Sequence, residues 1–220
     1  MVITYYGASC FKVQSGDLTI AFDPPSKGSD LKPPRFECHV VLSSHDHPLH
    51  NGLKELPGKK GEDPFFISGP GEYEYGGLQI TAIQSFHDNT SGKKLGTNTI
   101  YVVEMENIRL CHLGDLGQGE LEAESIEVIG KSDVLFVPVG GKDVIDAETA
   151  AKIITQLEPR VVIPMHYAIL KTALKGARVD EFLKELGEEK IKPEDKFTFK
   201  KKELPEDGMK VVLLEPVISL

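Results

Sequence analysis

The chain has little of what marks secreted or membrane-spanning proteins. Its three cysteines, Cys10, Cys38 and Cys111, are widely spaced and include no CxxC pair, which argues against a disulfide framework and for a reducing compartment. No apolar run approaches the roughly 18 residues of a membrane span. The opening MVITYYGASC lacks the basic flank and apolar stretch of a signal peptide. We therefore expect a cytoplasmic protein that has no membrane partner.

Positive charge is also scarce. The 220 residues include 25 Lys and Arg against 34 Asp and Glu, a formal net charge of -9. A net negative field repels polyphosphate, which argues against nucleic acid as a partner. The 40% hydrophobic content is enough for one large core. Because no linker or low-complexity tract interrupts the pattern, we expect a single domain over residues 1–220, of undetermined oligomeric state.

Short apolar runs alternate with turn residues along most of the chain. They predict strands at 2–7, 10–14, 18–22, 39–44, 65–68, 78–86, 99–104, 108–113, 134–139, 160–165, 196–201 and 210–215. Helical spacing of apolar residues predicts helices at 120–131, 146–158 and 179–187. Asp146 is the expected N-cap of the second helix. The segment GPGEYEYGG at 69–77 is interpreted as a turn.

Side chains that bind metals follow one predicted strand after another. Loops at one edge of a layered sheet converge, so such residues can meet although they are distant in sequence. Imidazole nitrogens and carboxylate oxygens are the ligands of zinc and similar divalent ions. A lone histidine after a strand is usually structural, but a solvated loop has no reason to gather three. The candidate ligands are His45, His47, His50, His87, Asp115 and His166.

Other polar residues near these positions receive different interpretations. His39 begins a strand and is assigned a structural role. For His112 two interpretations stay open: its side chain either supports the metal ligands by hydrogen bonding or faces away from them. Asp46 lies between two candidate ligands, and its side chain should point away from them, so we assign it to loop stabilisation. Asp88 is interpreted as a solvated turn residue.

The order of the candidate ligands resembles that of the metallo-β-lactamase superfamily. Within it, the phrases TYYGASCFKV, GPGEYE, GTNTIYVVE, HLGDLG, PVGG and IPMHY resemble small metal-dependent hydrolases related to ascorbate-6-phosphate lactonase. This resemblance covers essentially the whole chain. It implies an α/β fold, an αββα four-layer sandwich of two mixed β-sheets flanked by helices, with the site at one edge between the sheets.

The resemblance also implies roles for individual residues. His45, His47 and His87 would hold a first metal, Asp115 would bridge, and His50 and His166 would hold a second. Asp115 and His166 are the expected catalytic residues, and Asp23 would support the histidine loop. This chain departs from the family pattern at Leu49, where H-x-H-x-D-H has an aspartate, and at Ala8, where relatives commonly have a histidine.

These two departures lead to the expectation of one tightly bound ion and a second that is weak or absent. The ion is zinc or another divalent transition metal, with manganese, nickel and iron as alternatives. A metal can lower the pKa of bound water from 15.7 to about 7. We therefore predict a hydrolase that uses a metal-activated water on a small ester, lactone or phosphodiester.

Two alternatives to that hydrolase are kept. The changes at Leu49 and Ala8 favour a catalytically decayed metal-binding or ligand-sensing protein on the same fold. An RNA-processing nuclease is less favoured because the chain is short and acidic. Substrate specificity would come from loops such as 26–35 and 89–96, in which Lys93 and Lys94 are interpreted as solvated.

Overall fold

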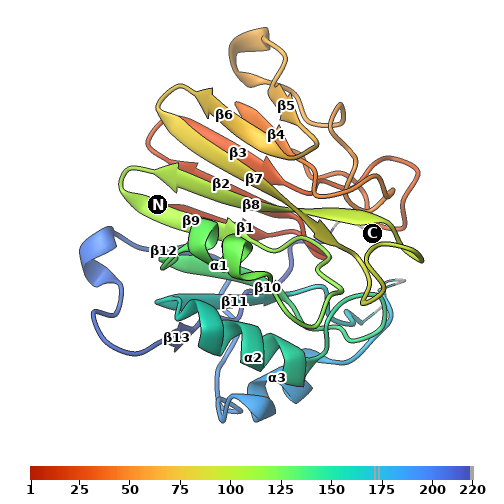
Figure 1. The fold of residues 1–220 in the computed structure, drawn as a ribbon. Coiled ribbons are helices and arrows are strands. Elements are labelled where there is room, and N and C mark those ends of the chain that lie inside the picture. Colours follow the sequence, from red (N-terminus) through yellow and green to blue (C-terminus); the bar gives the residue numbers. More distant parts are fainter. Residues whose placement is uncertain (171, 173, 219–220) are drawn as a thin grey trace.

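Two β-sheets stack against each other in the computed structural model, which describes residues 1–170, 172 and 174–218 (Figure 1). The six-stranded sheet has the order β12-β1-β2-β3-β4-β5. Its first four strands pair antiparallel, and β3, β4 and β5 pair parallel. Its strands are β1 (Val2–Tyr5), β2 (Phe11–Ser15), β3 (Leu18–Phe22), β4 (Val40–Leu42), β5 (Phe65–Ile67) and β12 (Phe197–Thr198).

The seven-stranded sheet has the order β13-β11-β10-β9-β8-β7-β6 and is also mixed. The strands from β6 to β9 pair antiparallel, and β9, β10, β11 and β13 pair parallel. All residues of β10 and β11 are buried, as expected for apolar runs in parallel strands. The strands are β6 (Gly71–Tyr75), β7 (Leu78–Phe86), β8 (Thr97–Met105), β9 (Ile108–His112), β10 (Val134–Pro138), β11 (Val161–Met165) and β13 (Lys210–Val211).

The helices lie beside β9, β10 and β11 of the second sheet (Figure 1). Asp146 caps α2 by accepting a hydrogen bond from the Thr149 amide at 2.9 Å, as predicted. No helix in the described part of the chain combines the length and apolar character needed to cross a membrane. The helices are α1 (Ala123–Ile129), α2 (Ala147–Leu157) and α3 (Val179–Glu185), with 3-10 turns η1 (Lys59–Gly61) and η2 (Lys201–Glu203).

Aromatic rings fill the space between the two sheets. Phe11 and Phe22 from the first sheet contact Phe136 from the second, with ring centroids 4.5 and 5.9 Å from it. On β3 and β4, Ala21 and Val41 belong to a separate apolar cluster with Cys38 and Leu56, which come from loops. The predicted sandwich of two mixed sheets flanked by helices is confirmed.

One local prediction was wrong. The segment 69–77 is not only a turn, because Gly71–Tyr75 forms β6, an edge strand that pairs antiparallel with β7. Glu72 and Glu74 are exposed on this edge. Charged residues and glycine have low strand propensity, which concealed a strand held by pairing on one side only. The last two predicted strands are also shorter than expected, at Phe197–Thr198 and Lys210–Val211.

Candidate metal centre

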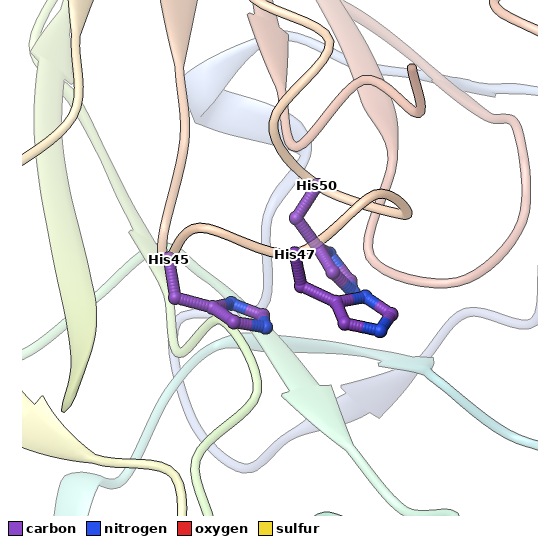
Figure 2. Close-up of side chains that lie close together, drawn as sticks. All are labelled: His45, His47 and His50. Atoms are coloured by element: carbon purple, nitrogen blue, oxygen red, sulfur yellow. The ribbon is translucent and has the colours of Figure 1, made fainter. Parts of the chain in front are cut away.

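Four separate segments bring the candidate ligands together, each just after a strand. The loop after β4 carries three histidines, and His87, Asp115 and His166 follow β7, β9 and β11. Figure 2 shows the side chains of His45, His47 and His50 close together within one loop. The convergence expected from the strand ends is therefore present in the structure.

The carboxylate of Asp115 lies at the centre of this cluster. Its Oδ2 atom is 3.0 Å from Nε2 of His166 and 3.1 Å from Nε2 of His50. The same oxygen is 3.6 Å from Nε2 of His87 and 3.9 Å from Nε2 of His45. One buried oxygen thus faces four imidazole nitrogens.

Among the described residues, three groups of three offer ligand atoms that lie within 4.8 Å of one another inside each group. Two of these groups share Asp115, and its role as a bridge between two ions stays a prediction. The exposed His47 groups with His45 and His50. Its predicted partnership with His87 stays a prediction. The groups are His45–His47–His50, His45–His87–Asp115 and His50–Asp115–His166.

The nitrogens that face Asp115 are poorly satisfied by the protein itself. Nε2 of His45, His50 and His87 is buried and has no well-oriented hydrogen-bond partner among the described residues. Leaving a buried polar atom unpaired costs roughly 1–3 kcal/mol, so such atoms are rare unless something else satisfies them. Neutral imidazoles grouped around a carboxylate fit a divalent cation. The donor set therefore suits a metal.

Burial keeps two of the histidines ready to coordinate. It lowers the pKa of His45 to about 4, despite the opposing attraction of Asp115. It also lowers the pKa of His87. Both imidazoles are therefore neutral at physiological pH, which is the state that binds metals.

His50 and Asp115 behave differently because they lie against each other. Burial favours neutral His50, but the negative charges of Asp115 and Asp23 outweigh it and raise the His50 pKa well above its ordinary value. Burial likewise disfavours ionised Asp115, yet His166 and His50 hold the Asp115 pKa well below its usual range. Without a metal, the cluster stores a proton on His50 beside an ionised Asp115.

Zinc binding is expected to release a proton even at about pH 8, above the ordinary histidine pKa of about 6.5. A cation held by Asp115 would compete with protonated His50 for the same oxygen, and the His50 proton would be released. Because the folded pKa of His50 is raised, metal affinity should rise with pH through the neutral range and weaken as pH falls. Calorimetry in two buffers of different ionisation enthalpy counts the protons. Identical heats in both buffers would contradict the expectation.

Asp23 holds the start of the histidine loop, as the resemblance implied. Its Oδ1 accepts a hydrogen bond from the Ser44 amide at 2.6 Å, and its Oδ2 accepts one from Ser44 Oγ at 2.7 Å. The same Oδ2 is 3.5 Å from Nδ1 of His50. The two bonds to Ser44 fix the residue that precedes His45, and they place the Asp23 carboxylate beside the His50 imidazole.

Two residues that orient Asp115 were not predicted. Ser9 Oγ donates to Asp115 Oδ1 at 2.7 Å, which leaves Oδ2 facing the histidines. Asn98 Oδ1 accepts from the Asp115 amide at 2.9 Å, and its Nδ2 donates to the Leu113 carbonyl at 2.9 Å. Both lie inside phrases that carried the family resemblance, GASC and GTNT. That membership was the only signal for them in the sequence.

Replacing Ser9 by alanine is expected to weaken metal affinity by about 10 to 100-fold, the usual cost of losing a group that orients a ligand. The Asp115 carboxylate would be free to rotate because Oδ1 loses its donor. Competition titration with a chromophoric zinc chelator measures the change. Ser132→Ala removes another buried hydroxyl and serves as the control. An unchanged affinity in Ser9→Ala would show that Ser9 does not orient Asp115.

Two histidines outside the cluster, His112 and His39, have structural roles. His112 is fully buried, with Nε2 placed to donate to the Ser9 carbonyl at 2.9 Å and Nδ1 accepting from the Gly114 amide at 3.2 Å. It therefore supports the two segments that carry Ser9 and Asp115. Nδ1 of His39 accepts from the Thr19 amide, so its structural assignment is confirmed.

Two aspartates next to candidate ligands differ from each other. Asp46 is exposed and accepts a hydrogen bond from Asn51 Nδ2 at 2.7 Å, which confirms its loop-stabilising role. The interpretation of Asp88 as a solvated residue was wrong, because only 6% of it is exposed. Its carboxylate accepts hydrogen bonds from Thr90 and from amides up to Leu95, and these donors lower its pKa. Asp88 thus organises the loop after His87.

Two glycines, Gly117 and Gly140, let their segments pack closely against the backbones of His87 and His166. A Cβ atom at Gly117 would lie 2.2 Å from the His87 carbonyl oxygen, and one at Gly140 would lie 2.1 Å from that of His166. His166 itself has a φ of 52°, an uncommon conformation for a residue with a side chain. Its amide donates to the Ala8 carbonyl at 2.8 Å, which helps to hold it there. Such strained positions cluster at functional sites.

Comparison with known proteins agrees with this geometry. The model of the beta-lactamase superfamily domain matches residues 2–166. A UPF0173 protein of Pyrococcus furiosus is 30% identical over 213 residues, which cover 87% of this chain and 93% of the relative. A protein of Thermococcus onnurineus named as a UPF0173 metal-dependent hydrolase is 26% identical over 190 residues, covering 75% and 84%.

Solved structures also match along nearly the whole chain. A candidate Zn-dependent hydrolase of the metallo-β-lactamase superfamily from Thermotoga maritima is 31% identical, with a TM-score of 0.76 over 98% of this chain and 100% of that one. A metallo hydrolase from Ignicoccus hospitalis shares the fold, with 24% identity and a TM-score of 0.64 over 90% of this chain and 99% of that one.

Proposed function

The chain belongs to the beta-lactamase superfamily domain family, and from this premise we propose that it hydrolyses a small ester, lactone or phosphodiester at the Asp115 cluster. Relatives named as metal-dependent hydrolases support the general activity. The observation that carries the proposal is the Asp115 Oδ2 atom, which faces four imidazole nitrogens, three of them buried without a well-oriented hydrogen bond.

We assign His45, His47, His87 and Asp115 to the tighter ion, and His50, His166 and Asp115 to the weaker position. A bound divalent ion supplies Lewis acidity, which polarises a carbonyl or phosphoryl oxygen and lowers the pKa of water to about 7. Zinc is the first choice, and manganese, nickel or iron also suits imidazole and carboxylate donors.

The protein's own groups hold these ligands in a fixed arrangement. Ser9 fixes the Asp115 carboxylate, Asn98 holds the Asp115 backbone amide, and Asp23 lies against the far nitrogen of His50. His166 is half-buried and 3.0 Å from Asp115, so it lies where a substrate can reach it. We therefore propose Asp115 and His166 as the residues closest to the reacting atoms.

The position of the second ion is weakened by its surroundings. Leu49 lies between His47 and His50 in the loop and offers no donor side chain. Ala8 is fully buried beside the His166 backbone and offers none either. His50, His166 and Asp115 then supply three donors, which is enough for an open site but gives less charge neutralisation than a second carboxylate would.

Turnover with defined substrates tests this function. Protein loaded with zinc or manganese would be assayed on lactone, p-nitrophenyl ester and bis-p-nitrophenyl phosphate panels, with chelated protein as the control. We expect metal-dependent hydrolysis in at least one class. If the loaded and chelated proteins are equally inert on every class, the hydrolase proposal fails and the ligand-sensing alternative is favoured.

A further inference from the structure

The side of the site that lacks two expected ligands is apolar. Ala8, Leu31 and Leu174 form a small buried cluster that is separate from the main core. Leu49 and Ile169, both only partly buried, pack against it, as does Ile218. We refer to these six residues as the apolar wall. The two residues that replace donors thus belong to the same hydrophobic cluster.

The apolar wall is built on the same segments as the ligands. Leu49 directly precedes His50, and its amide lies 3.3 Å from Nδ1 of His47. Ala8 accepts the hydrogen bond of the His166 amide, and Ile169 follows His166 by three residues. The wall is therefore adjacent to the half of the site formed by His50 and His166, and its partly exposed members are Leu49, Ile169 and Ile218.

The loop after His87 has a different character. The loop after His87 carries exposed Lys93 and Lys94, and buried Asp88 organises it. Next to the wall, by contrast, Leu170 is 81% exposed. Binding sites for small molecules are mostly apolar, with a few polar groups that fix orientation. The segments that carry the candidate ligands supply both parts.

We propose that the apolar wall binds an aliphatic or aromatic group of the substrate, with Leu49 and Ile169 as the residues that determine this specificity. The inference rests on the proposed hydrolase function and narrows its substrate class to carboxylic esters or lactones with an apolar group. In the reaction the acyl C–O bond breaks, water oxygen joins the acyl carbon, and a proton passes to the released alkoxide. The residue at position 49 thus exchanges a metal donor for a contact with substrate, and buried Ala8 supports the wall from behind.

A chain-length series measures this contact. Each methylene that becomes buried against the wall is expected to raise kcat/KM by about fourfold, equivalent to about 0.8 kcal/mol. The metal-loaded protein would be assayed on p-nitrophenyl acetate, butyrate and hexanoate. Leu49→Ala and Ile169→Ala should make kcat/KM rise less with acyl chain length. Val128→Ala, an exposed apolar residue on α1, should leave it unchanged. A wild-type rate that does not depend on chain length would overturn the inference.

A binding experiment separates this inference from the proposed function. Alkyl hydroxamates bind zinc without being hydrolysed, and their affinities for the zinc-loaded protein can be measured by calorimetry. We expect affinity to rise with alkyl length in the wild type and to rise less in Leu49→Ala. If affinity rises with alkyl length but no ester is hydrolysed, the apolar wall binds an apolar group and the hydrolase proposal fails. If the protein hydrolyses esters but its hydroxamate affinities do not depend on alkyl length, the proposed role of the apolar wall is wrong and the hydrolase function still holds.

Discussion

Asp115→Asn is expected to lower metal affinity by more than about 100-fold and to abolish metal-dependent hydrolysis. Losing a group that merely orients a ligand costs about 10 to 100-fold, and Asp115 is itself the oxygen shared by two of the ligand groups. Asparagine keeps the shape of the side chain and removes its charge. A dication would then lose the negative charge that lies 3.0 to 3.9 Å from the four imidazole nitrogens.

Asp46→Asn is the matched control for this substitution. It also neutralises a carboxylate near the histidines, but Asp46 is exposed and its hydrogen bond from Asn51 can be kept by the amide oxygen. Elemental analysis after gel filtration and zinc titration would measure both variants, and circular dichroism would show that both fold. Wild-type metal content in Asp115→Asn would contradict the central position of this residue.

Leu49→Asp is expected to convert the weak second position into a stable one. It adds a carboxylate beside His50, where the family pattern has its aspartate, and a further charge neutralises a second dication. Leu49 is only partly buried, so the loop can accept the change without leaving an unpaired carboxylate in the core. The molar ratio of bound metal to protein should rise from one toward two.

The same variant separates a hydrolase from a decayed relative. If the wild type is inert and Leu49→Asp gains both a second ion and hydrolysis, the wild-type protein is a metal-binding or ligand-sensing form of the fold. If the wild type is active with one ion, a second ion should change its rate rather than create it. Val128→Asp, on exposed α1, controls for added charge. Unchanged metal content in Leu49→Asp would show that the aspartate alone does not build the site.

The ligand cluster could be predicted because its signal is local. Each candidate follows an apolar strand, and strand ends converge at a sheet edge. The structure confirms the meeting of His45, His50, His87 and His166 around Asp115. Their action as metal ligands remains a prediction for the experiments above.

The supporting residues could not be predicted because their partners are remote. Ser9 and Asp115 are 106 positions apart, and no periodicity links a lone serine to a distant carboxylate. Asp88 was misread for a related reason, since its many donors are loop amides that carry no sequence signature. The edge strand β6 was missed because tertiary pairing overrode weak local propensity.

Anomalous scattering from a zinc-loaded crystal tests the central claim most directly. We predict a peak in contact with Asp115 Oδ2 and with Nε2 of His45 and His87, and a weaker or missing peak between His50 and His166. An ion bound elsewhere on the chain, or an Asp115 carboxylate that stays against protonated His50 in saturating zinc, would contradict the account.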